Sequence, residues 1–280
     1  MTALDAQFTA RCGGDAAGLA ARYLAAQSVA REAGRLALDY LADRGRLQVE
    51  AKGPHDFVTA ADRAVEALIA ERLAAAFPTD ALLGEESHTA HTPDTADLLW
   101  VVDPIDGTAN FVRNLPDWCV SIGLLVQGRP ELGVIYVPAA DELYAARRGH
   151  GAFCNSVAIH ASDRATIAGA TIGLDHSFGD PSADHRAHIA AVHAHGGEYR
   201  RNGSGAVSLT RVASGRLDGF VELHLNAWDV AAGIVLVQEA GGWTNDFLAG
   251  DNLGKNNPII AAGPGIRDEL LAITGLGAWR

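Results

Sequence analysis

Leu98-Leu99-Trp100-Val101-Val102-Asp103-Pro104-Ile105-Asp106-Gly107-Thr108 runs through the middle of the chain. Its apolar first half predicts a buried strand, and two carboxylates three residues apart follow it at once. Pro104 and Gly107 predict that the strand stops there, because proline lacks an N–H and glycine favours turns. Two buried carboxylates this close repel each other unless a cation lies between them, and Mg²⁺ prefers oxygen ligands. The stretch therefore predicts half of a metal site for phosphate chemistry.

The composition is that of an ordinary globular protein, with 280 residues, 48% hydrophobic and 20% charged. This length suits one large domain or two closely packed lobes. The net charge of −12 argues against nucleic acid as a partner. An anionic small substrate would therefore need a metal ion or oriented backbone N–H groups to bind.

The cysteines and the N-terminus indicate the compartment. Cys12, Cys119 and Cys154 are odd in number and form no CxxC motif, which favours a reducing environment. Charged residues interrupt the apolar character of the N-terminus, so we expect no signal peptide. No apolar run approaches the ~20 residues that span a bilayer. We expect a soluble cytoplasmic protein with no membrane partner.

The first half of the chain predicts two helices and then an antiparallel sheet. Residues 1–16 are expected to form a loosely ordered lead, followed by a helix over 17–43. Thr59-Ala60-Ala61-Asp62 has the form of a capping box, and the helix that it starts should end at Pro78. A strand is expected over residues 98–102. After it, the expected strands of one antiparallel sheet cover residues 120–126, 132–137, 143–146 and 152–153.

Strand and helix patterns alternate in the second half, which predicts a mixed α/β sheet. The expected strands cover 170–174, 219–223 and 258–262, and the expected helices 182–195, 206–213, 230–240 and 266–273. We divide the chain into a lobe of residues 17–160 with most of the metal ligands and a lobe of residues 161–280 with Asp229. The two lobes should form one compact catalytic unit.

Three further acidic segments accompany the opening stretch: Asp56–Asp62, Gly84-Glu85-Glu86-Ser87 and Trp228–Gly233. Each has a purely structural explanation when taken alone. Asp62 could serve only in the capping box, Asp229 only as the N-cap of a helix with Gly241 at C′, and Glu85 only as a solvated loop acid. Asp103 and Asp106 are harder to explain this way, because two acids that leave one buried strand need a compensating partner.

Together, these four segments resemble the inositol monophosphatase family of Mg²⁺-dependent, lithium-sensitive phosphomonoesterases. Asp56-Phe-Val-Thr-Ala-Ala-Asp62, Gly84-Glu-Glu-Ser87, Trp100 to Phe111 and Trp228-Asp-Val-Ala-Ala-Gly233 with Glu239-Ala-Gly-Gly242 stand in the family's order and spacing. The resemblance spans roughly residues 20–275. It implies the α/β class with a layered αβαβα sandwich, commonly as a homodimer.

The resemblance also implies the metal ligands. Glu85, Asp103 and the carbonyl of Ile105 would hold one Mg²⁺, and Asp103, Asp106 and Asp229 a second. A third, weaker ion would bind near Glu85, and Lys52 matches a basic residue in a loop near it. Two metals about 3.5–4 Å apart clamp both the attacking water and the leaving oxygen.

Catalysis is implied for Asp62, Glu85 and Thr108, with Thr108 and Asp62 positioning the nucleophilic water. The N–H groups of Gly107 and Thr108 would face the phosphate. For the alcohol, the resemblance points to Asp106, Ser204, Gly205 and Glu222. Gly205 stands where the family more often has alanine, and Asn226 where animal members have histidine. Arg200 and Arg201 could approach a phosphate or a partner subunit.

The leading prediction is hydrolysis of inositol-1-phosphate or a similar small polyol phosphate. Histidinol phosphate is the alternative, since a carboxylate such as Glu222 could pair with its ammonium group. A 3′,5′-bisphosphate nucleotidase, a fructose-1,6-bisphosphatase, a metal-dependent nuclease and a non-catalytic interaction protein are less favoured. A zinc site in the segment of His185, His188, His193 and His195 is also less favoured than solvated or partner-facing histidines.

Overall fold

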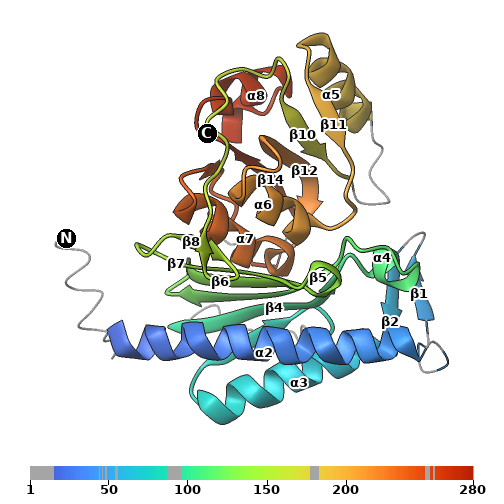
Figure 1. Ribbon diagram of the computed structural model, residues 1–280, viewed down its shortest axis with the longest axis vertical. Helices are drawn as coiled ribbons and strands as arrows, with labels where there is room; N and C mark the ends of the chain where they lie inside the picture. The colour runs from blue at the N-terminus through green and yellow to red at the C-terminus, as the bar shows by residue number, and fades with distance from the viewer. Residues whose placement is uncertain are drawn as a thin grey trace.

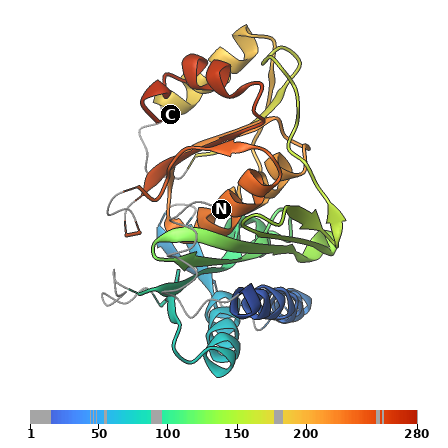
Figure 2. The ribbon, with the colours of Figure 1, turned by 90° about the vertical axis from the view of Figure 1, so that its left-hand side faces the viewer.

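The computed structural model describes residues 16–43, 45, 47, 49–53, 56–87, 96–176, 183–249, 253–254 and 256–279. Figures 1 and 2 show five layers, in the order helices, sheet, helices, sheet, helices. Helices α2 (Ala16–Ala42) and α3 (Ala60–Ala76) cover the outer face of a seven-stranded sheet. Helices α6 (Gly205–Ala213) and α7 (Ala227–Glu239) lie between this sheet and a five-stranded sheet. The far side of the five-stranded sheet carries α5 (Ala183–Ala194) and α8 (Arg267–Ile273). The expected αβαβα sandwich is confirmed.

The helices have the following bounds: α2 Ala16–Ala42, α3 Ala60–Ala76, α4 Thr108–Val112, α5 Ala183–Ala194, α6 Gly205–Ala213, α7 Ala227–Glu239 and α8 Arg267–Ile273, with short 3₁₀ turns η2 Pro138–Ala140 and η3 Gly277–Trp279. The strands are β1 Val49–Gly53, β2 Asp56–Thr59, β3 Ala81–Gly84, β4 Leu98–Asp106, β5 Cys119–Val126, β6 Arg129–Val137, β7 Glu142–Arg147, β8 Ala152–Cys154, β9 Val157–Ala158, β10 Thr171–Leu174, β11 Glu198–Arg200, β12 Gly219–Leu225, β13 Trp243–Thr244 and β14 Asn257–Ala262.

The two N-terminal helices follow their sequence signals closely. α2 begins at Ala16, so the expected lead of residues 1–16 is one residue too long at its end, and its other residues lie outside the described chain. α3 starts from the predicted capping box, in which Thr59 caps the helix and Asp62 accepts the Thr59 N–H. Its buried face packs with that of α2 against the sheet.

The seven-stranded sheet has the order β3-β4-β5-β6-β7-β8-β9 and is antiparallel except for the β3–β4 pair. The prediction that the central strand stops before Pro104 is wrong, because β4 runs on to Asp106. Asp103 pairs with Ser121 and Asp106 with Cys119, so two residues of β4 oppose one residue of β5. This β-bulge leaves Pro104 outside the regular ladder, where its missing N–H costs nothing.

The bulge also decides where the two acids point. Residues three apart on a regular strand face opposite sides of the sheet. The extra residue shifts this alternation by one, so Asp103 and Asp106 face the same side as Ser121 and Cys119 on β5. That side carries α7, since the Ser121 hydroxyl donates to the carbonyl of Trp228.

The middle layer lies unusually close to the strands. Gly123 and Gly133 are cross-strand neighbours on β5 and β6. A Cβ built on Gly133 would lie 2.2 Å from the carbonyl oxygen of Ala232, and one on Gly123 would lie 3.1 Å from the Ala231 methyl. The two glycines therefore let α7 rest on the backbone of the sheet.

The five-stranded sheet has the order β11-β10-β12-β14-β13 and is mixed, as predicted. α7 begins one turn earlier than predicted, so the N-cap is Asn226 and not Asp229. Asp229 is instead the third helical residue, and its Oδ2 accepts the Asn226 N–H at 2.6 Å. Gly241 lies at C′ with φ +83°, as expected.

Candidate active site

Three carboxylates from two distant segments meet where α7 crosses β4. One carboxylate oxygen from each of Asp103, Asp106 and Asp229 lies within 4.8 Å of the other two. All three side chains are buried. The bulge brings the first two to one face of the sheet, and the first turn of α7 supplies the third. Such a group of oxygen ligands suits a hard divalent cation.

The acids strongly perturb one another. Burial, reinforced by the charges of Glu85, Asp106 and Asp229, raises the pKa of Asp103 well above its usual range. Burial and the Asp106 charge raise the pKa of Asp229 to about 7. Buried like charges are costly unless a cation or protons neutralise them, so this cluster is built to receive positive charge.

Asp106 is held in place by the start of α6. Its Oδ2 accepts hydrogen bonds from the Ser204 hydroxyl at 2.5 Å and from the Ala206 N–H at 2.7 Å. Burial raises the pKa of the Asp106 carboxyl, and these bonds from the start of α6 lower it. Ser204 also accepts the Val207 N–H as N-cap of α6. The hydroxyl therefore joins a helix start to an acid of the cluster.

Asp62 and Thr108 form a second polar group beside the cluster. The Thr108 hydroxyl lies 3.3 Å from Asp62 Oδ1 and 3.0 Å from the Ile105 carbonyl oxygen, so its single proton can be donated to either acceptor. Asp62 Oδ2 accepts from both the N–H and the hydroxyl of Thr59. Burial raises the pKa of Asp62 to about 6, against the hydrogen bonds from Thr59. Asp62 thus serves the capping box and contacts Thr108 at once.

Glu85 follows β3 and lies beside β4, where its N–H donates to the Val102 carbonyl. Its charge acts on Asp103, but its carboxylate lies outside the 4.8 Å group. A buried glutamate that the sequence did not single out supports this segment. Glu66 accepts the Glu86 N–H at 2.8 Å, and a Cβ on Gly84 would lie 2.5 Å from the Glu66 carboxyl carbon.

The turn after β4 is tightly enclosed. Gly107 is the N-cap of α4 with φ +91°, a conformation that favours glycine. A Cβ there would lie 2.8 Å from the Asp117 carbonyl oxygen and 3.0 Å from the Ser204 Cβ. Ile105, whose carbonyl accepts from Thr108, is fully buried between the two acids of β4.

A cavity of about 680 Å³ opens from this cluster. Its inner wall includes Glu85, Asp106, Thr108 and Asp229. Its other walls include Asp175, His176, Arg201, Gly203, Ser204, Gly205, Glu222 and Asn226. Glu222, on β12, is buried, whereas Arg201 is exposed. The structure therefore brings together the residues expected for the metal, the phosphate and the alcohol.

The family model described as "Inositol monophosphatase family" matches residues 19–274. The chain belongs to the inositol monophosphatase family. An inositol-1-monophosphatase of Mesorhizobium japonicum is 39% identical over 244 residues, 86% of this chain and 91% of the relative. The Nus factor SuhB of Escherichia coli K12 is 36% identical over 245 residues, 87% of this chain and 91% of the relative.

Solved structures of family members agree with the fold. The extragenic suppressor protein suhB of Bartonella henselae superposes with a TM-score of 0.83 at 37% identity, covering 90% of this chain and 98% of that one. The inositol monophosphatase of Anabaena superposes with a TM-score of 0.80 at 32% identity, covering 94% and 100%.

One departure from the usual family sequence has a steric explanation. A Cβ on Gly205 would lie 2.9 Å from Leu225 Cδ1, so Leu225 takes the space that an alanine methyl would need. The second departure, Asn226, caps α7 through its backbone.

The remaining expected residues do not join the acid cluster. Among the residues that the structure describes, Asp103, Asp106 and Asp229 form the one group with metal-binding spacing, so the histidine segment forms none. The expectation of a solvated or partner-facing side chain is wrong for His188, which is buried with its Nε2 at the Thr274 carbonyl. His193 meets the Tyr199 ring edge to face, and His195 contacts the Ala191 carbonyl. The His185 ring meets, edge to face, that of His176, which lines the cavity. Arg200 is exposed on β11, and the side chain of Lys52 lies outside the described residues.

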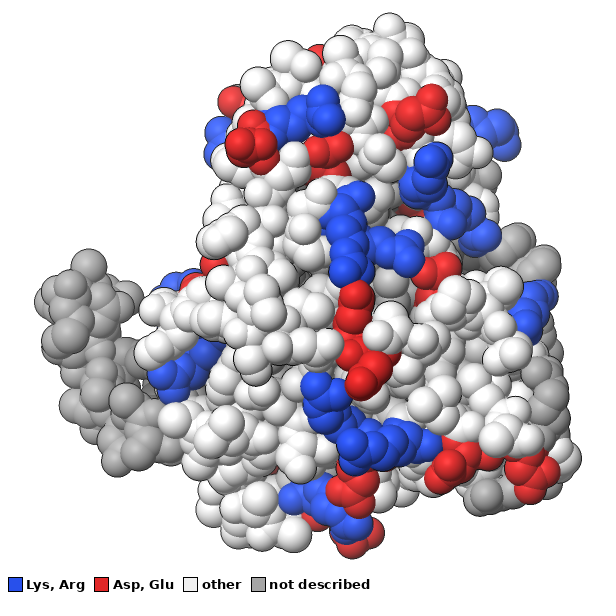
Figure 3. Space-filling model, viewed as in Figure 1, with Lys and Arg blue, Asp and Glu red and all other residues white. Residues whose placement is uncertain are grey.

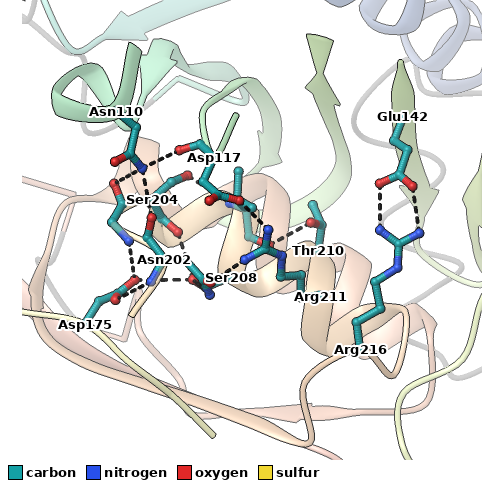
Figure 4. A network of polar contacts seen from close by, with 12 residues as sticks. Asn110, Asp117, Glu142, Asp175, Asn202, Ser204, Ser208, Thr210, Arg211 and Arg216 are labelled. Carbon is teal, nitrogen blue, oxygen red and sulfur yellow. Dashed lines mark hydrogen bonds and ion pairs between the residues drawn. The ribbon is translucent and has the colours of Figure 1, made fainter. Parts of the chain in front are cut away.

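Two further polar residues at the cavity escaped the sequence analysis. Asn110 on α4 donates to the carbonyls of Asp117, Asn202 and Gly203. Asp175, directly after β10, accepts from the N–H groups of Asn202 and Gly203 (Figure 4). A signal existed for Asp175, because ligands of α/β sheets gather at the carboxyl ends of parallel strands.

Proposed function

We propose that this protein is a Mg²⁺-dependent phosphomonoesterase that hydrolyses inositol-1-phosphate or a similar small polyol phosphate. The observation that carries the proposal is the meeting of Asp103, Asp106 and Asp229 beside the Thr108–Asp62 pair, in a member of the inositol monophosphatase family. The product would be the alcohol and inorganic phosphate.

The ligand assignment follows the donor set. Glu85, Asp103 and the Ile105 carbonyl would hold one Mg²⁺, and Asp103, Asp106 and Asp229 a second, with a third ion near Glu85. The raised pKa values of the buried acids support this, since carboxylates crowded together without a cation favour their protonated form. Bound Mg²⁺ supplies a water of lowered pKa and charge neutralisation at the leaving oxygen.

Thr108 and Asp62 are proposed to orient the attacking water. The Thr108 hydroxyl contacts Asp62 Oδ1, so it can accept a hydrogen bond from the water while it donates to the carboxylate. With its pKa at about 6, Asp62 is mostly ionised at neutral pH. This pKa is also close enough to the ambient pH for the carboxylate to accept a proton during the reaction. The N–H groups of Gly107 and Thr108 are proposed to contact the phosphate.

The alcohol side is assigned to Glu222, Asp106, Ser204 and Gly205. Glu222 is buried at the cavity wall, where a carboxylate can accept hydrogen bonds from sugar-like hydroxyls. In this structure the Ser204 hydroxyl already donates to Asp106. The contribution of Ser204 to recognition is therefore proposed to be the placing of Asp106 and of the Gly205 N–H.

A phosphate-release panel with Mg²⁺ tests the proposal. It should compare inositol-1-phosphate, histidinol phosphate, fructose-1,6-bisphosphate and adenosine 3′,5′-bisphosphate, with and without EDTA. We expect the highest kcat/KM on inositol-1-phosphate and complete loss in EDTA. Faster turnover of histidinol phosphate would replace the proposed substrate, and release that persists in EDTA would overturn the metal mechanism.

The relatives named Nus factor SuhB motivate a second candidate function, as a Nus factor. It ranks second because the full acid set of an enzyme is present.

Acidic and basic side chains are interspersed over the face shown in Figure 3. Among the described residues, no helix has the length and apolar character that crossing a bilayer requires. Homodimer formation, lithium sensitivity, a cytoplasmic location and the lack of a nucleic-acid partner stay predictions.

A further inference from the structure

The loop before α6 forms part of the cavity wall but contributes no residue to the acid cluster. It comprises residues 202–204 and leads into Gly205, the first residue of the helix. Gly203 has φ +72°, in the left-handed region that favours glycine. A loop of this kind has no regular pattern of backbone hydrogen bonds. Its shape therefore depends on the groups that its N–H and C=O groups bind.

The N–H groups of this loop point to one carboxylate. Asp175 Oδ1 accepts from the Asn202 N–H at 2.9 Å, and Asp175 Oδ2 accepts from the Gly203 N–H at 3.1 Å. The Ser208 hydroxyl lies 3.4 Å from the same Oδ2 and accepts from the Asn202 side chain at 2.9 Å. Asp175 is only 5% exposed, so these contacts are shielded from water (Figure 4).

The carbonyl groups of the same loop point the other way. The Asn110 side chain donates to the Asn202 carbonyl at 2.8 Å and lies 3.4 Å from that of Gly203. Arg211 contacts both the Asn202 side chain and Asp117 (Figure 4). The loop is therefore clamped between Asp175 of one lobe and Asn110 of the other.

We propose that Asp175 is a positioning residue that sets the alcohol preference of the enzyme by holding the 202–204 loop. The loop carries Ser204, which donates to Asp106, and leads to Gly205, which lines the cavity together with Glu222. If the Asp175 carboxylate is lost, two N–H groups lose their shared acceptor and the loop can change shape. Asp175 continues β10 beside Val221, so it lies at the same end of the sheet as Glu222.

This inference rests on the proposed function, and Asp218 offers a matched control. Asp218 is also buried and also accepts an N–H of β10, that of Thr171 at 2.7 Å, together with the Ser162 hydroxyl at 2.5 Å. It does so at the opposite end of the strand, and it does not line the cavity. Asp218→Asn thus removes a comparable buried charge without touching the loop.

The test compares Asp175→Ala, Asp175→Asn and Asp218→Asn with the unmodified protein, using inositol-1-phosphate and para-nitrophenyl phosphate in Mg²⁺. In Asp175→Ala we expect the kcat/KM for inositol-1-phosphate, divided by that for para-nitrophenyl phosphate, to fall about tenfold. The cause should be mainly a higher KM for inositol-1-phosphate. Asp175→Asn, which keeps one acceptor oxygen, should give a ratio between that of Asp175→Ala and that of the unmodified protein. Asp218→Asn should leave the ratio unchanged even if it unfolds at a lower temperature.

Amide hydrogen exchange gives a second readout that needs no activity. Exchange at residues 202–207 should be faster in Asp175→Ala than in either the unmodified protein or Asp218→Asn. An unchanged substrate ratio with unchanged exchange in both Asp175 variants would overturn the positioning role. If the unmodified protein releases no phosphate from any ester, the proposed function fails, and the exchange experiment still decides whether Asp175 holds the loop.

Discussion

The acid cluster and the 202–204 loop face the same cavity, but they are built in different ways. Asp103 and Asp106 come from one strand, and Asp229 comes from the first turn of one helix, so short motifs place them. The loop has no motif of that strength and takes its shape from Asp175 and Asn110, which are 65 residues apart in the chain. Each acid of the cluster therefore stands in a recognisable short motif, although the packing of α7 on β4 is needed to bring them together, whereas the loop is defined by long-range contacts alone.

The largest effect is expected from Asp103→Asn. Asp103 is proposed to bind both metals, so its loss should lower Mg²⁺-dependent phosphate release on the order of a thousandfold or more. The fold should persist, because the change removes one of several repelling charges. Phosphate release and thermal unfolding with and without Mg²⁺ check this. Near-normal turnover would show that the metal assignment is wrong, and the exposed Asp163→Asn is the matched control.

Thr108→Val should have the next largest effect, lowering kcat about a hundredfold on every ester, because it removes the hydroxyl between Asp62 and the water. Single-turnover kinetics measure it. Thr274→Val removes another buried hydroxyl, one that donates to Leu270 in the outer layer, and should keep full activity. Equal losses in the two variants would contradict the catalytic role of Thr108.

Glu222→Gln tests the alcohol half. We expect about a tenfold fall in kcat/KM for inositol-1-phosphate relative to para-nitrophenyl phosphate, since a buried acceptor for the hydroxyls is weakened. Glu198→Gln, on the exposed edge strand of the same sheet, should change neither value. Equal losses on both esters in Glu222→Gln would remove Glu222 from recognition.

Asp175 should make the stability of the protein depend on pH. Burial raises the pKa of Asp175 to about 6, against the hydrogen bonds from Asn202 and Gly203. The folded state therefore holds a proton more tightly than the unfolded state, and stability falls as pH rises from about 4 to about 6. The side chain at this position stays neutral at every pH in Asp175→Asn, so the stability of this variant relative to the unmodified protein should increase across that window, by about 3 kcal/mol at most.

Thermal unfolding of the two proteins at several pH values between about 4 and 7 measures this difference. Asp218→Asn against the same reference corrects for the general loss of a buried carboxylate. A difference between the unmodified protein and Asp175→Asn that stays constant over this range would contradict the raised pKa.

Gly205→Ala should have the smallest effect. Its new methyl would lie 2.9 Å from Leu225 Cδ1, and the end of a leucine side chain can rotate away. We expect changes in kcat/KM of less than about threefold, and Leu225→Val in the same chain should reduce even these. A loss above tenfold that Leu225→Val does not relieve would point to direct contact between Gly205 and the alcohol.

Local signals explain what the sequence could predict. The capping box at Thr59 and the longer strands of both large sheets depend on near neighbours in the chain, and they were found. The short strands β3, β9, β11 and β13 were missed, as were β1 and β2, which form a two-stranded ribbon of their own.

The misses share a cause, which is that the deciding partner lies elsewhere. β4 continues past Pro104 because it forms a bulge against β5. No local sequence pattern predicts this bulge. Asp229 was assigned one turn too early in its helix, since an acid can serve equally as N-cap or as third residue. Asp175 and Asn110 bind a loop whose position only the packed lobes determine.

The close approach of α7 to Gly133 bears on how far the separation of the acids can be altered. Asp229 lies three residues before Ala232, whose carbonyl oxygen occupies the space where a side chain on Gly133 would begin. Any larger residue at 133 must lift the helix from the sheet, and Asp229 would move away from Asp103 with it. Position 133, which contributes no atom to the cavity wall, thus limits how closely α7, and with it Asp229, approaches the sheet that carries Asp103. A substitution at 133 would therefore change the spacing of the three acids without altering any of the carboxylates.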